Sequence, residues 1–147
     1  MDLVRKAFDQ HVVLAVALLG GLGLISGPLA AEEHQVILGT ITVDPALADR
    51  IEPQDRLIIK LYHPGDGVEL DAKYQILTDF ELPLAFTMMP SIDMNGRTKF
   101  NAYVIEVFTD KDDDVLAVAE GELAGRTPEP VPLGTKDLEI RLDKLRE

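Results

Sequence analysis

The sequence predicts an all-β fold, a two-sheet antiparallel sandwich of about seven strands with immunoglobulin-like topology, preceded by one N-terminal apolar helix. Three observations lead to this prediction. Val12–Ala31 is a run of twenty residues without a charge, and it follows the basic pair Arg5 and Lys6. From Gln35 onward, short alternating apolar runs are separated by turn residues. A chain of 147 residues has room for one ordinary domain beside such an apolar segment.

The apolar segment fits two kinds of export signal. A cleaved signal peptide has an apolar stretch of about 7–15 residues before a small-x-small site, whereas a membrane-spanning helix needs about 20. Leu29–Ala31 is an acceptable cleavage site, but the length of the segment and its upstream positive charge favour a single-pass anchor. We therefore predict that residues 1–31 are a signal peptide or an anchor. In the anchored form, Gly23 and Gly27 would let a second membrane helix pack closely.

Residues 35–147 are predicted to form one periplasmic β-sandwich domain. The fifth predicted strand is apolar on both faces, which places it in mid-sheet. The last strand turns apolar residues inward and charged residues outward, which is typical of a sheet with one face in water. Asp44 and Pro45 are suited to begin a helical turn at residues 44–49. The predicted strands are Gln35–Val43, Arg56–Tyr62, Lys73–Leu77, Leu84–Met88, Phe100–Phe108, Val115–Ala119 and Asp137–Leu142.

Charge and composition exclude several functions. Residues 1–31 hold two basic and two acidic residues, so the exported part carries the whole net charge of −12, which repels nucleic acid and anionic lipid. The chain has no cysteine and therefore no disulfide, thiol nucleophile, thiolate metal site or lipid-attachment cysteine. Ser91 lacks the strained-elbow motif of a hydrolase, and the three histidines are not spaced as ligands. We predict no catalytic residue, no enzyme activity and no cofactor.

Two sequence patterns offer metal-ligating side chains. The acidic run Asp110–Asp114 departs from the EF-hand pattern, because Val115 stands where glycine is needed and Gly121 stands where glutamate is needed. A solvated turn is the better interpretation. Met88, Met89 and Met94 offer thioether ligands for a soft metal, but Met88 falls on the inward register of its strand. We predict no metal site.

The connection that follows the fourth strand is the predicted partner-binding surface. Methionine, proline and isoleucine on a connecting segment make an adaptable apolar surface. The predicted contact residues are Met88, Met89, Pro90, Ile92 and Met94.

A set of collinear fragments resembles the C-terminal periplasmic domain of the CcmI/CycH family of cytochrome c biogenesis factors. The fragments are Gly39–Ala48, Leu82–Leu84 followed by Phe86–Thr87, Gly121–Gly125 and Gly134. The resemblance implies an immunoglobulin-like domain that helps to handle apocytochrome c. Family members also carry tetratricopeptide repeats and two membrane helices, and nothing in this chain resembles the repeats. The chain is also similar, more loosely, to small periplasmic lipoproteins of the YbaY/YscW type, whose lipid-bearing cysteine it lacks.

These observations predict a non-catalytic periplasmic binding or assembly module, standing alone without the repeats, in c-type cytochrome maturation. One alternative is a structural accessory subunit of a membrane complex such as a respiratory complex, anchored by its N-terminal helix. A third is a periplasmic metal carrier. The expected partner is a protein, such as apocytochrome c, a maturation component or a respiratory-complex subunit, together with the inner membrane if the helix is retained. No nucleic acid is expected as a partner.

Overall fold

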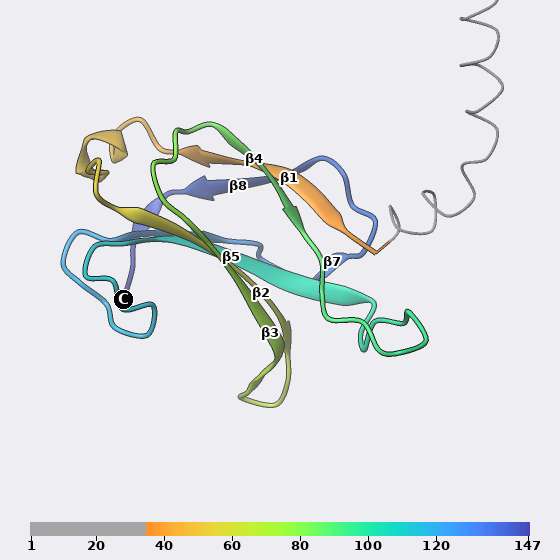
Figure 1. Ribbon diagram of the computed structural model, residues 1–147. Helices are drawn as coiled ribbons and strands as arrows, with labels where there is room; N and C mark the ends of the chain where they lie inside the picture. The colour runs from red at the N-terminus through yellow and green to blue at the C-terminus, as the bar shows by residue number, and fades with distance from the viewer. Residues whose placement is uncertain (1–34) are drawn as a thin grey trace, which may run out of the picture. The chain divides into compact units, whose positions relative to one another are not determined.

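The computed structural model describes residues 35–147, which fold into two β-sheets packed face to face (Figure 1). The predictions about residues 1–31, with Gly23 and Gly27, lie outside the described residues. No helix within residues 35–147 is long and apolar enough to cross a membrane. The elements are β1 Ile37–Val43, a 3-10 turn Ala48–Arg50, β2 Arg56–Pro64, β3 Glu69–Leu77, β4 Leu84–Met88, β5 Ala102–Asp110, β6 Leu123–Arg126, β7 Val131–Pro132, β8 Leu138–Leu142 and β9 Lys144–Leu145.

The two sheets differ in size and in strand direction. The smaller has the order β4-β1-β8, and the larger has the order β3-β2-β5-β6-β9 with β7 paired to the start of β5. The prediction of an all-antiparallel sandwich was wrong at one pair, because β1 and β8 are parallel. Parallel neighbours need a long crossover connection. The rest of the domain supplies it, since β1 opens the described fold and β8 lies near its end.

Most predicted strands are confirmed, but the sixth is wrong. Residues 115–119 form a turn in which the Asp114 carboxylate accepts hydrogen bonds from the backbone N–H of Leu116 at 3.0 Å and of Ala117 at 3.3 Å. Because side chains make these hydrogen bonds with the backbone, the segment does not need to pair with a neighbouring strand. The strand lies further along the chain, at β6, where none was predicted. The short β7 and β9 were also not predicted.

The predicted helical turn near Asp44 is confirmed in part. The Asp44 carboxylate accepts a hydrogen bond from the Ala46 N–H at 3.0 Å, as expected of a residue that begins a turn. The helical residues themselves are shifted toward the 3-10 turn Ala48–Arg50.

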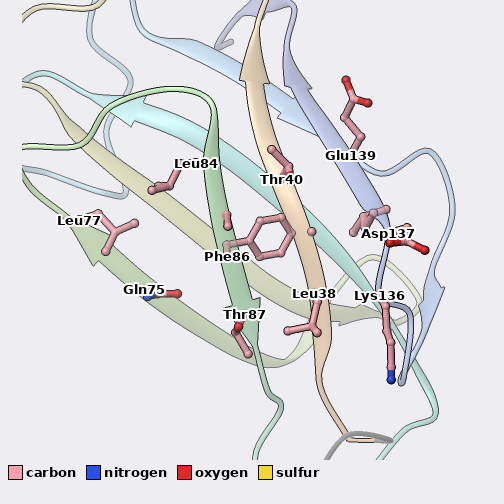
Figure 2. A pocket seen from close by; sticks show the side chains of 13 residues that line it. Leu38, Thr40, Gln75, Leu77, Leu84, Phe86, Thr87, Lys136, Asp137 and Glu139 are labelled. Atoms are coloured by element: carbon pink, nitrogen blue, oxygen red, sulfur yellow. The ribbon is translucent and has the colours of Figure 1, made fainter. Parts of the chain in front are cut away.

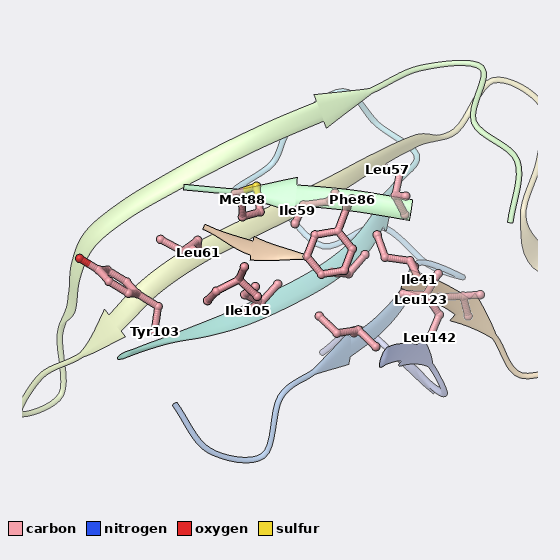
Figure 3. Packing of buried hydrophobic residues seen from close by; sticks show 13 residues of the cluster. Ile41, Leu57, Ile59, Leu61, Phe86, Met88, Tyr103, Ile105, Leu123 and Leu142 are labelled. Carbon is pink, nitrogen blue, oxygen red and sulfur yellow. The ribbon is translucent and has the colours of Figure 1, made fainter. Parts of the chain in front are cut away.

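The core lies between the two sheets, and β5 crosses it in mid-sheet between β2 and β6, as predicted. Tyr103, Ile105 and Val107 of β5 face the smaller sheet and pack with residues such as Phe86 and Ile41 (Figure 3). Phe108 lies on the opposite face, in a smaller cluster with Ile58 and Ala124. Burial on both faces explains why β5 reads as nearly continuously apolar.

The sandwich is closed along one side and open along the other. On the closed side, the chain passes from β8 into β9, which pairs with β6, and the Asp143 N–H donates to the Ala124 carbonyl at 3.2 Å. There the backbone of Gly125 lies directly against the Arg141 carbonyl. On the open side, β4 and β3 are the terminal strands of their sheets. This open side is next to the predicted contact segment, which continues directly from β4.

Candidate functional site

The predicted contact residues divide into two core residues and three surface residues. Met88 is only 4% exposed and belongs to the main core cluster, and Pro90 is also buried, so neither residue presents its side chain at the surface. Met89 and Ile92 are 40% and 49% exposed, and Met94 is fully exposed. Because Met88 is in the core and Met94 is in solvent, the methionines do not present one set of thioether ligands. The remaining surface is apolar and lies on one loop.

This loop, residues 89–99, is called the Met94 loop. The Asp93 carboxylate accepts hydrogen bonds from the N–H of Asn95 at 2.8 Å and of Arg97 at 2.9 Å, and the Asp93 N–H donates to the Arg97 carbonyl at 2.8 Å. Ile92 forms a β-bridge with Thr98. These bonds close a defined turn at the tip of the loop, where Met94 is held in water. A preorganised turn reduces the backbone conformational entropy that is lost on binding.

A groove of about 760 Å³ lies beside β4 (Figure 2). The groove runs along the outer face of the smaller sheet and continues past β4 to β3 of the larger sheet. Its floor has small side chains, Thr40, Ala85 and Thr87, and this smallness leaves the face hollowed. Leu77 and Gln75 of β3 line the groove beyond β4. The other lining residues are Leu38, Gly39, Leu84, Phe86, Lys136, Asp137, Leu138 and Glu139.

The acidic run Asp110–Asp114 is anchored to the domain at Asp110 and is exposed from Asp112 onward. Arg56 is ion-paired with the buried carboxylate of Asp110, while Asp112 and Asp113 are exposed. Burial alone would raise the pKa of Asp110, but hydrogen bonds from Arg56 and from the backbone at Asp112 lower it below its ordinary value, as does the positive charge of Arg56. The arrangement anchors the turn to β2.

Carboxylate oxygens of Asp110, Asp112 and Glu122 lie within 4.8 Å of one another, close enough to share a cation. Two of the three carboxylates already have strong donors. Asp110 is bound by Arg56, and Glu122 accepts the Lys111 N–H at 2.9 Å and an Arg146 N–H at 2.9 Å. Arg56 and Arg146 therefore already compensate two of the three carboxylate charges, and we assign the cluster a structural role.

Sequence reasoning missed Arg146, which organises this end of the domain. Its guanidinium donates to the Glu122 carboxylate at 2.9 Å and to the carbonyls of Ala117 at 2.7 Å and Val115 at 2.8 Å. It also lies 3.8 Å from the centre of the Phe108 ring. A single basic residue near the end of a sequence carries no signal of such contacts, because they depend on the fold.

His63 packs against aromatic side chains, and Ser91 lies on the surface. His63 stacks on Phe100 with ring centres 3.8 Å apart, and its Nδ1 is 2.9 Å from the Ala102 carbonyl. Ser91 is exposed on the Met94 loop. His63 lies at the end of β2, and its ring contacts are aromatic. This setting gives His63 a packing role.

Tyr103 should make stability sensitive to strongly alkaline pH. Its hydroxyl donates to Asp71 at 2.9 Å, and burial together with this bond raises its pKa from 10.0 to about 12. A raised pKa in the folded state contributes stability that is present below about pH 10 and is lost as pH rises to about 12. Two pKa units correspond to roughly 2–3 kcal/mol. Urea unfolding from pH 9 to 12 should show this extra loss in wild type and not in Tyr103→Phe, whereas parallel losses would contradict it.

Comparison with known proteins adds one structural likeness. No protein-family model matches the chain, and no curated protein matches it. The fold is similar to an alternative pilotin from the type II secretion system of Vibrio cholerae, with a TM-score of 0.49 and 16% sequence identity. The match covers 77% of this chain and 98% of that one. A likeness at this level says nothing about activity or partners.

Proposed function

We propose that the protein is a non-catalytic binding and assembly module of the periplasm that acts in the maturation of c-type cytochromes. The Met94 loop is the observation that carries the binding role, because it holds Met89, Ile92 and Met94 in solvent on a hydrogen-bonded turn. Large apolar side chains that are exposed together on one segment are typical of protein contact sites. We assign the contact with a partner protein to this loop.

The arrangement of charge supports a binding role over catalysis. Asp110, Glu122 and Asp55 are buried carboxylates, and each is ion-paired with a basic side chain, Arg56, Arg146 and Lys111 respectively. A general acid or base needs a carboxylate whose pKa is raised toward the working pH, and Asp110 is shifted in the opposite direction. We propose that these pairs stabilise the fold.

The cytochrome assignment and the immunoglobulin-like topology rest on the resemblance to the CcmI/CycH periplasmic domain. The partner that this resemblance implies is apocytochrome c or another maturation component. The stretch Thr87–Met94, which overlaps the Met94 loop, resembles the Met-rich segment of the family, although its order of residues differs.

A second candidate function is a structural subunit of a membrane complex such as a respiratory complex. It is favoured by the twenty uncharged residues Val12–Ala31 behind a basic pair, which fit an uncleaved anchor. Gly23 and Gly27 would then pack against a partner helix. A native N-terminus at Glu32, found by sequencing the mature protein, would exclude the anchored form.

Affinity co-purification of the full chain from membranes tests the proposed function. We expect to recover a c-type cytochrome, a maturation component or a respiratory-complex subunit. Recovery of the intact protein without any member of these classes would contradict the proposal.

A further inference from the structure

β4 is an edge strand whose sequence carries none of the usual protection against pairing. It pairs with β1 in regular antiparallel register, from Ile37 opposite Met88 to Ile41 opposite Leu84, and has no neighbour on its other side within the described residues. Natural proteins protect edge strands with charge, proline or a bulge. The five residues Leu84–Met88 include no charged residue and no proline, and their pairing has no register break.

The other sheet edges are protected. β3 carries Glu69, Asp71 and Lys73, and Asp71 lies in the left-handed region with φ of 53° next to a register break in the β2–β3 pairing. β9 has only two residues, and β8 lies on the closed side of the sandwich. β4 is therefore the edge at which another strand can pair with least opposition.

The groove provides room for that strand. A paired strand lies about 4.8 Å from its neighbour, so a strand added to β4 would lie between β4 and the Leu77 and Gln75 side chains of β3. Leu77 and Leu84 are half-buried and pack against the core. Apolar side chains of the added strand that point inward would cover these two leucines, while Ala85 and Thr87 leave space for those that point outward.

Charge distinguishes a foreign strand from a second copy of the chain. The described residues include 22 of the 26 acidic residues and 12 of the 14 basic ones, a net charge of −10. Two copies brought together at β4 would repel each other, whereas a basic segment would be attracted. The charged residues that line the groove, Asp137, Glu139 and Lys136, are also acidic in sum.

We propose that β4 binds an extended segment of a partner protein by β-strand addition, and that this segment alternates apolar residues and carries flanking basic residues. Main-chain hydrogen bonds to the free edge supply affinity, and the side chains over Leu77 and Leu84 supply specificity. The proposal rests on the proposed binding role and gives it a mechanism, with the Met94 loop directly after the strand as a second contact.

A synthetic peptide tests the proposal with the full chain in detergent solution. The probe is a peptide of about nine residues in which valine alternates with threonine, flanked by lysine. We expect saturable binding by fluorescence anisotropy, and about tenfold weaker binding of the counterpart flanked by glutamate. Methylation of alternate backbone nitrogens, on the set that faces β4, should abolish binding, because it removes the donors that pair with the edge.

Two alanine-to-lysine variants localise the site. Ala85 and Ala72 are both exposed on terminal strands, and only Ala85 lines the groove. Ala85→Lys should weaken binding of the lysine-flanked peptide about tenfold or more, and Ala72→Lys should leave it unchanged. Equal binding by Ala85→Lys and wild type, or no binding of the peptide, would overturn the proposal. A dimer in sedimentation velocity that Ala85→Lys abolishes would assign the edge to a second copy and also overturn it.

The peptide result is independent of the co-purification result. Peptide binding without any recovered maturation or respiratory partner would contradict the proposed function alone. Recovery of such a partner without peptide binding at β4 would contradict strand addition alone.

Discussion

Replacing Arg146 by alanine is expected to lower the free energy of unfolding by about 3–5 kcal/mol. The Glu122 carboxylate is almost completely buried and is paired with Arg146. Removing the guanidinium would leave that charge unpaired in the interior. The same change frees the carbonyls of Val115 and Ala117 and uncovers the Phe108 ring. One residue near the end of the sequence therefore stabilises the 115–119 turn, β6 and the smaller core cluster together.

Urea unfolding followed by circular dichroism measures the effect of Arg146→Ala. Arg141→Ala is the matched control, because Arg141 is 52% exposed and its ion pair with Asp44 is 3.7 Å long. An exposed pair contributes about 1 kcal/mol or less. Equal losses in the two variants would contradict the role assigned to Arg146.

Replacing Gly125 by alanine is expected to cost about 3 kcal/mol or more. An added Cβ at Gly125 would lie 2.0 Å from the Arg141 carbonyl oxygen and 2.7 Å from its carbon. The opposing atoms are backbone, so no side-chain rotation relieves the overlap. β8 would have to move away from β6, which opens the closed side of the sandwich.

Gly67→Ala is the control for this substitution. Gly67 has φ of +74°, but an added Cβ there meets no atom within 4 Å, so only backbone strain of about 1–2 kcal/mol applies. Thermal and urea unfolding should rank Gly125→Ala clearly below Gly67→Ala in stability. A Gly125→Ala variant as stable as Gly67→Ala would show that the two sheets are not in close contact at this point.

The parts of the fold that could be predicted are those with a local signal. The bounds of β4 were predicted correctly, because Leu84, Phe86 and Met88 alternate with smaller exposed residues. β5 was placed in mid-sheet because both of its faces are apolar. These signals depend only on neighbouring residues and on the two-residue period of a strand.

The parts that could not be predicted depend on residues far apart in the sequence. Val115, Ala117 and Ala119 alternate in burial as a strand would. Yet the Ala117 N–H donates to Asp114, and the carbonyls of Val115 and Ala117 accept from Arg146, which is 31 residues from Val115. The parallel pairing of β1 with β8 joins the two ends of the domain and has no local signal. In both cases the tertiary contacts override the local pattern.

Only the part of the candidate site that has a local sequence signal could be predicted. The apolar character of Met89, Ile92 and Met94 is visible in the sequence, whereas their exposure is seen only in the structure. That β4 is a free edge follows only from the strand order, which places no strand beyond it among residues 35–147. The groove likewise depends on β3 lying near β4. The sequence around Leu77 and Gln75 does not indicate that these residues line a groove.

The central claim is that the Met94 loop contacts the partner protein, and co-purification with two charge-introducing variants tests it most directly. Leu116 is a matched apolar site, because it is 82% exposed on a different turn. Met94→Asp should reduce recovery of the maturation or respiratory partner about tenfold, because a charge would be buried in an apolar contact. Leu116→Asp should leave recovery unchanged. Equal recovery with wild type and both variants would contradict the claim.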